Sequence, residues 1–471
     1  MKVSRLKILF LILAHIILVI LLLVLFANPV SEQQYPKRAD ESEEHLQNEF
    51  NQQFRDYVNP IEDFLMITTE TKEEPPDKVL DIQLNKTTEP AKSMITTKKP
   101  LNQTQSKSNR TSLDVPSTTL EQTTWKSLKA NNFTAEPKWE FEEDYILVTS
   151  SHHTTCPLSI KIKAHNVSWL KERFLHDITI FMDARHFNNQ EWRRLAHFIP
   201  PYGWWELEYP VVKEVMSVLP YVPDQQLLLA ESRGKAPGCV TCAVVGNGGI
   251  LNASRMGKEI DSHDYVFRVN GAMIKGYEAD VGMRTSFYGF TAFTMLSSFY
   301  LLNRRGFSTV PKDEETKYIL FTEGQRDFEW LKAVQQNKEL GQGYLRQYRV
   351  RPREDFGNNF DFKKLLVVHP DFSRYLKNRF LRSNILNGQW WRIYRPSTGA
   401  LVLLTALHLC DVVSVYGFMT EDFRDYADHY YDKTHTKVVL YINHDFLLEK
   451  DLWARLHEQD IIKLYKGNKG L

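Results

Sequence analysis

Apolar and polar positions divide the 471-residue chain into regions of different pattern. Residues 8–27 form a continuous apolar run that only His15 interrupts. A helix over this run is about 30 Å long, the thickness of the hydrocarbon core of a bilayer. Residues 28–141 show neither a helical nor a strand period, whereas both periods occur from Tyr145 onward. The pattern predicts a membrane-spanning helix, a stem and a folded domain over 142–471.

The charges around the apolar run predict its orientation. Lys2, Arg5 and Lys7 precede it, and acidic residues follow soon after it. Positive flanks stay in the cytoplasm, so residues 1–7 form a cytoplasmic tail and the rest of the chain is translocated. A buried core helix is the alternative, but such helices are rarely apolar all round. A cleaved signal peptide has a shorter apolar core, so we expect an uncleaved type II anchor.

Residues 28–141 are rich in Thr, Ser, Lys, Glu, Gln and Pro. Such a composition buries too little apolar surface to offset the entropy lost on ordering, which predicts a disordered stem. Sequons for N-glycosylation agree with a lumenal location. They begin at Asn85, Asn102, Asn109, Asn132 and, in the folded region, Asn166. A further sequon at Asn252 lies in an expected helix, and we expect it to be unoccupied or on the outer face.

The folded region alternates between the two periods. Strands are expected at residues 178–182, 243–245, 265–269, 317–322, 365–370, 411–417 and 438–442. Helices are expected from Ile250 onward, over residues 328–336 and 372–380, and after Ser397. This alternation predicts an α/β domain. The net charge of +1 does not favour nucleic acid as a partner.

One stretch joins a strand, a glycine turn, a helix and a second strand. Gly246-Asn247-Gly248-Gly249 follows the first strand, and Asn270 follows the second. Such a unit places N–H groups and a helix N-terminus against a phosphate. Leu251 occupies the third glycine position of the dinucleotide fingerprint, and Asn270 stands where that fingerprint has an acidic residue. The stretch therefore predicts a nucleotide site that is not a dinucleotide site.

Further candidate residues lie near the C-terminus. Ser397 and Thr398 begin a helix, where they either bind an anion or cap the helix. His444 follows the expected strand 438–442, and ligands gather at the carboxyl ends of strands in α/β sheets. The chain contains no Asp-x-Asp, the motif through which many sugar-nucleotide transferases bind a metal. We therefore expect neither a metal nor another cofactor.

Four cysteines, an even number, fit two disulfides in an oxidising compartment. Cys239 and Cys242 are also spaced for a redox or zinc site, although no His or Cys pair lies at the spacing that zinc would need. Both interpretations remain open at this point.

Four motifs in this order resemble those of the animal sialyltransferase family. Gly246-Asn247-Gly248 with its flanks resembles the large sialyl motif, and residues 397–417 resemble the small one. His429-Tyr430-Tyr431-Asp432 resembles the third motif, and His444 with Glu449 the very small one. The resemblance covers roughly residues 145–465. Residues 248–252, 287–293 and 351–354 are most similar to α-N-acetylgalactosaminide α-2,6-sialyltransferases, type I before type II.

The resemblance implies a GT-A-like (Rossmann-like) mixed sheet with helices on both faces. It implies a type II protein of the Golgi membrane with its catalytic domain in the lumen. The donor would be CMP-N-acetylneuraminic acid, and the acceptor the 6-hydroxyl of GalNAc O-linked to Ser or Thr of mucin-type glycoproteins. Transfer would be inverting and metal-independent, and would form sialyl-Tn type structures. Alternatives are a preference for Gal-GalNAc acceptors and a non-catalytic lumenal glycan-binding protein.

The resemblance also implies roles for individual residues. Asn247 and Asn270 would bind the CMP part, and Ser397, Thr398 and Gly399 would face the phosphate or carboxylate of the donor. His429 would bind the departing phosphate, and His444 would take the proton from the acceptor hydroxyl. Glu449 would orient the helix or His444. The disulfides would join Cys242 to Cys410 and Cys156 to Cys239.

Overall fold

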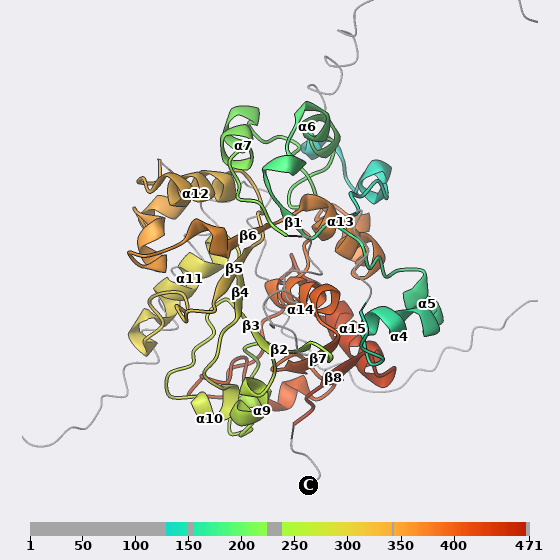
Figure 1. Cartoon of the computed structure of the whole chain (residues 1–471), viewed down its shortest axis with the longest axis vertical. Helices are drawn as coiled ribbons and strands as arrows, with labels where there is room; N and C mark the ends of the chain where they lie inside the picture. The colour runs from blue at the N-terminus through green and yellow to red at the C-terminus, as the bar shows by residue number, and fades with distance from the viewer. Residues whose placement is uncertain (1–128, 149–153, 224–237, 342, 468–471) are drawn as a thin grey trace, which may run out of the picture. The chain divides into compact units, whose positions relative to one another are not determined.

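The computed structural model describes residues 129–148, 154–223, 238–341 and 343–467 (Figure 1). The expected cytoplasmic tail, the apolar run at 8–27 and the sequons at Asn85, Asn102 and Asn109 lie outside these ranges. Among the helices in the described ranges, none has both the length and the apolar character needed to cross a membrane.

The described residues contain one eight-stranded sheet of order β1-β6-β5-β4-β3-β2-β7-β8. Its strands are β1 (Phe181–Met182), β2 (Thr241–Val245), β3 (Tyr265–Val269), β4 (Phe287–Phe290), β5 (Lys317–Leu320), β6 (Leu365–Val368), β7 (Val412–Tyr416) and β8 (Ile462–Leu464). β1 runs antiparallel to β6, and the other neighbouring strands run parallel. The expected mixed sheet is confirmed.

Helices cover both faces of this sheet (Figure 1). On one side lie α13 (Pro370–Arg379), α14 (Thr398–Leu409) and α15 (Phe446–Glu458), and on the other α11 (Ala292–Leu302) and α12 (Gln325–Gln336). α14 is buried along almost its whole length and packs across β2, β3, β4 and β7. Strands covered on both faces are apolar throughout, which explains the continuous apolar runs in the sequence.

The chain order places a switch point at β2. From β2 the chain builds β3, β4, β5 and β6 in one direction, and β7 and β8 lie on the other side of β2. Val245, the last residue of β2, pairs with Arg268 of β3 and with Tyr416 of β7. In such sheets the crevice at the carboxyl ends of the two strands that flank the reversal is the usual ligand site. The glycine turn follows directly after β2, at this edge of the sheet.

Residues 129–141, which their composition assigned to the stem, pack against the folded domain. Ala130 and Glu140 are fully buried, and Lys377 of α13 donates a hydrogen bond to Glu136. Burial raises the pKa of Glu140 to about 8, although the charge of Lys377 opposes this shift. The boundary at Phe141 is therefore corrected, because a few aromatic and paired charged side chains are enough to bury a segment of polar composition. The sequons at Asn132 and Asn166 lie on exposed residues.

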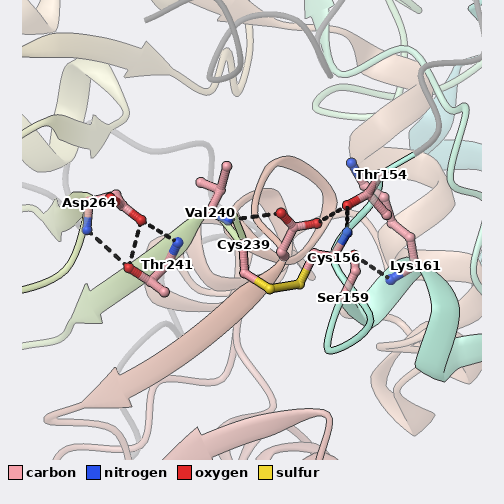
Figure 2. The surroundings of a disulfide bond; sticks show 9 residues. Thr154, Cys156, Ser159, Lys161, Cys239, Val240, Thr241 and Asp264 are labelled. Carbon is pink, nitrogen blue, oxygen red and sulfur yellow. Dashed lines mark hydrogen bonds between the residues drawn. A yellow bond between two sulfur atoms is a disulfide. The ribbon is translucent and has the colours of Figure 1, made fainter. Parts of the chain in front are cut away.

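Both expected disulfides are present. Cys156 bonds to Cys239 beside Val240, whose N–H lies within hydrogen-bond distance of Asp411 (Figure 2). Cys242 of β2 bonds to Cys410, the C-cap residue directly after α14. The Cys-x-x-Cys redox and zinc interpretations are thus excluded. The Cys242–Cys410 bond joins these elements at the end away from the glycine turn, so it sets the spacing of helix and sheet and not the shape of the turn.

Two expected elements are wrong. The helix from Ile250 is a 3-10 turn (Gly249–Leu251), and α9 (Gly257–Asp261) begins only later. Ala253 and Arg255 have φ values of 58° and 59°, and the carboxylate of Asp280 accepts hydrogen bonds from both of their N–H groups. A left-handed residue cannot continue a helix, so the glycine turn has no long helix behind it. The sequon at Asn252 is exposed and lies outside any α-helix.

Residues 438–442 form no strand. The run is therefore a half-buried connection, and the reasoning that placed His444 at a strand end is wrong even though His444 lies just before α15.

Candidate active site

The loops after β2 and β7 meet through their backbones. The N–H groups of Gly246 and Gly248 donate to the carbonyls of Tyr416 and Gly417, at 2.8 and 2.9 Å. A Cβ on Gly248 would lie 2.7 Å from the Gly417 oxygen, closer than real Cβ atoms approach. Gly417 itself has a φ of 70°, which favours glycine. The glycines are required because two main chains meet here without room for side chains.

Asn247 and Asn270 stand at the carboxyl ends of the neighbouring strands β2 and β3. The Asn247 Nδ2 group donates to the carbonyl of Val269 at 3.3 Å, which orients its amide. Asn270 has a φ of 46°, and its carbonyl accepts from the Tyr288 hydroxyl at 2.5 Å. The Oδ1 atoms of both asparagines are buried and have no hydrogen-bond partner. Buried acceptors normally have partners, so the two amides fit a ligand that donates hydrogen bonds here.

The start of α14 lies beside the glycine turn. The Phe418 ring would contact Cβ atoms placed on Gly246 and on Gly399, at 3.1 and 3.5 Å. Ser397 caps the helix, since its Oγ accepts from the Ala400 N–H at 3.1 Å. The Ser397 N–H and hydroxyl donate to the two carboxylate oxygens of Glu449, at 2.7 and 2.6 Å. The Ser397 hydroxyl is thus engaged as a cap, which leaves the N–H groups of the first turn to face an anion.

His429 is brought to the same turn by a backbone bridge. His429 pairs with Gly248, and the Tyr430 N–H donates to the carbonyl of Asn247 at 3.0 Å. The His429 Nδ1 atom lies 3.4 Å from Asp432 Oδ2 and 3.6 Å from Asp428 Oδ2. Burial disfavours the cation, but the hydrogen bond with Asp432 and the charges of both carboxylates outweigh it and raise the pKa of His429. This imidazole is suited to contact an anion.

His444 has the opposite environment. Its Nδ1 atom lies 2.8 Å from the carbonyl oxygen of Arg395. A carbonyl only accepts, so Nδ1 carries the proton and Nε2 keeps a lone pair. Burial lowers the pKa of His444 to about 4, so the ring is neutral near pH 7. Asn443 Nδ2 lies 3.3 Å from Nε2 and donates to this lone pair. A neutral imidazole whose Nε2 is an acceptor is suited to take a proton once a substrate hydroxyl replaces that amide.

The two histidines thus have pKa values shifted in opposite directions, the arrangement that separates an anion-binding cation from a base. The structure brings Asn247, Asn270, His429 and the start of α14 together around the glycine turn, at the carboxyl edge of the sheet. His444 joins this group through Arg395, which lies two residues before Ser397 and whose N–H donates to Asn443 at 3.0 Å.

Sequence reasoning missed Asp432 as the partner of His429, although the spacing of three residues was visible. It also missed Gly417 and Arg395, which become neighbours of the site only in three dimensions. Within the described ranges, no group of three or more His, Cys, Asp or Glu side chains is arranged to hold a metal ion.

Comparison with known proteins settles the family. Residues 181–461, more than half of the chain, match the model of glycosyltransferase family 29 (sialyltransferase). The chain belongs to glycosyltransferase family 29. This match contains every residue of the candidate site described above.

The chain is similar to several proteins with assigned names. It is 56% identical to alpha-N-acetylgalactosaminide alpha-2,6-sialyltransferase 1 of Gallus gallus over 72% of this chain and 60% of that protein. The type 1 protein of Homo sapiens is 55% identical over 72% of this chain and 56% of its own length. The human type 2 protein is 44% identical over 58% of this chain and 73% of its own length. The matches thus span less than two thirds of these type 1 relatives.

A crystal structure of a mammalian sialyltransferase is 28% identical to this chain. The alignment of the two structures covers 68% of this chain and 100% of the other, with a TM-score of 0.48.

Proposed function

We propose that this family 29 sialyltransferase transfers sialic acid from CMP-N-acetylneuraminic acid to the 6-hydroxyl of GalNAc O-linked to Ser or Thr of mucin-type glycoproteins. One observation supports GalNAc as the acceptor. The chain is 55–56% identical, over 72% of its length, to proteins named for this activity. The two unpaired amide oxygens of Asn247 and Asn270 support the donor site. The products are sialyl-Tn type structures.

In this proposal His444 is the base. Its Nε2 atom takes the proton of the acceptor hydroxyl while that oxygen attacks the anomeric carbon of the sialic acid. The bond from this carbon to the phosphate oxygen breaks, and CMP leaves with the electron pair. Attack from the face opposite the leaving group inverts the configuration.

The departing phosphate is anionic and needs positive or N–H partners. His429 with its raised pKa supplies a cation, and the first N–H groups of α14, at Thr398 and Gly399, supply donors. Ser397 and Glu449 position that helix end through their mutual hydrogen bonds. Asn247 and Asn270 accept hydrogen bonds from the CMP part. No step in this scheme requires a metal.

The location is also proposed. Residues 1–7 are cytoplasmic, residues 8–27 span the Golgi membrane, and the part from Asn28 to about Leu128 is the lumenal stem. The two disulfides and the exposed sequons at Asn132 and Asn166 support a lumenal domain. Glycosylated mucin-type proteins are the expected partners in that compartment.

The test uses the full-length chain, expressed where disulfides and N-glycans form and purified in detergent. It is incubated with CMP-sialic acid and either a GalNAc-peptide or a Gal-GalNAc-peptide, with and without EDTA. We expect an α-2,6-linked product on the GalNAc-peptide in both conditions. If only the Gal-GalNAc-peptide is sialylated, Gal-GalNAc is the acceptor and not bare GalNAc. Loss of product with EDTA would overturn the metal-independent scheme. No product on either peptide would refute the proposed function.

A further inference from the structure

Arg395 contacts the candidate base and a carboxylate at the same time. Its carbonyl oxygen accepts from His444 Nδ1 at 2.8 Å, and its Nε lies 3.0 Å from Glu323 Oε1. Glu323 stands three residues after the last residue of β5, at the carboxyl edge of the sheet. The ion pair therefore connects His444 to a central strand, although the segment that contains His444 forms no strand itself.

The ion pair is enclosed and has further partners. The side chains of Arg395 and Glu323 are only 15% and 11% exposed. Arg326 of α12 donates to the second carboxylate oxygen of Glu323 at 3.0 Å, and the Glu323 N–H donates to Asp327 Oδ2 at 3.2 Å. The Arg395 N–H is bound by Asn443 as well. Since both its backbone and its side chain are engaged, Arg395 has little freedom to move its carbonyl away from His444.

The pair also places two opposite charges beside the imidazole. The carboxylate of Glu323 favours the cation of His444, and the guanidinium of Arg395 disfavours it. Two other charged groups nearby belong to α12: Arg326 pairs with Glu323, and it also lies close to Asp327. Asp445 is engaged by Ser383 and Leu448, and Glu449 by Ser397. The charge balance at His444 therefore depends chiefly on Glu323 and Arg395.

We propose that Glu323 and Arg395 are positioning residues for His444: their ion pair fixes the carbonyl that selects the Nδ1-protonated ring, and their opposite charges balance each other at the base. The inference rests on the proposed function, because it takes His444 as the base. It predicts that removing either charge alone unbalances the site, and that the two removals act in opposite directions.

The test titrates the His444 imidazole by NMR of histidine-labelled protein, with the signal assigned by its loss in His444→Gln, and measures the pH profile of kcat. Glu323→Gln should move the His444 pKa and the acidic limb of kcat to lower pH by roughly one unit. Arg395→Met should move both to higher pH. In each variant kcat should fall about 10- to 100-fold, because the base is displaced, while both KM values change little.

Conservative variants separate this role from a folding defect. Glu323→Asp and Arg395→Lys should return the pKa toward the wild-type value, and thermal unfolding should resemble the wild type. Arg392→Met is the matched control, since Arg392 lies in the same loop but pairs with Glu206. Shifts in the same direction, or no shift with unchanged kcat, would overturn the inference. If the wild type makes no product, the proposed function fails, while the NMR titration still decides whether the pair acts on His444.

Discussion

The loop after β2 and the segment from His429 to His444 both belong to the candidate site, but different interactions determine how their residues are arranged. Backbone hydrogen bonds to the loop after β7 place residues 246–249, and no room remains for side chains at Gly248. The second segment contains no strand. A backbone bridge to Gly248 also places His429, but the side chains of both histidines are oriented by carboxylates, a carbonyl and an ion pair. The first region should therefore be sensitive to added volume, and the second to changes of charge and pH.

The largest effect is expected at the base of the second region. In the proposed function His444 accepts the proton, so kcat of His444→Ala should fall by about 10²- to 10⁴-fold. Donor KM should change little, because the variant leaves the glycine turn and α14 intact. His435→Ala is the control, since His435 is exposed and lies in the same segment. Steady-state kinetics with a GalNAc-peptide measure kcat and KM of both variants. A His444→Ala variant that keeps a tenth or more of the wild-type kcat would contradict the proposed role of His444.

The next effect tests the sensitivity of the first region to volume. A Cβ on Gly249 would lie 2.1 Å from the carbonyl oxygen of Ala427, a backbone atom that cannot turn away. Gly249→Ala should therefore destabilise the folded domain by about 1–3 kcal/mol. In Gly388→Ala the new Cβ meets only the Ile385 oxygen at 3.9 Å, so this control should unfold like the wild type. Thermal unfolding compares them, and equal transition temperatures would show that the two loops can separate without cost.

The contrast between the regions also explains what the sequence could predict. The strand before the glycine turn and the strand before Asn270 were predicted correctly, because their apolar runs are continuous and bounded by turn residues. The order of the four motifs predicted the family, and with it the disulfides. These features depend on residues that are close in the sequence or on motifs with fixed spacing.

Two of the wrong predictions depend on tertiary contacts. The helix from Ile250 fails because Asp280, distant in the sequence, binds the N–H groups of Ala253 and Arg255. Residues 129–141 pack on the folded domain, where Lys377 of α13 pairs with Glu136. In these two cases a partner more than 20 residues away in the sequence decides the local structure, and no local pattern reveals it. The run at 438–442 has strand composition but forms no strand, and nothing in the structure explains this difference.

A smaller effect is expected from the carboxylate beside His429. Asp432→Asn removes the hydrogen bond and charge that raise the pKa of His429, so the ring loses its proton at lower pH. Above that pH the phosphate meets a neutral ring, and the KM for CMP-sialic acid should rise about tenfold near pH 7.5 and less near pH 5.5. Glu314→Gln, at an exposed site, is the control. An increase in KM that is the same at every pH would show that Asp432 acts through structure and not through the charge of His429.

The smallest effect concerns Glu449, which binds Ser397, the N-cap residue of α14. Burial raises its pKa to about 7 from an ordinary value of 4.5, although the hydrogen bonds from Ser397 oppose the shift. Between these two values the folded state binds more protons than the unfolded state, so stability falls as pH rises from 4.5 to 7. Glu449→Gln does not titrate and should lack this component. We expect a loss of roughly 1 kcal/mol, or about 2–4 °C in Tm, between pH 5 and 7 in the wild type that the variant does not show. Glu458→Gln, exposed on the same helix, should keep the wild-type slope, and identical slopes in all three proteins would mean that Glu449 is ionised throughout.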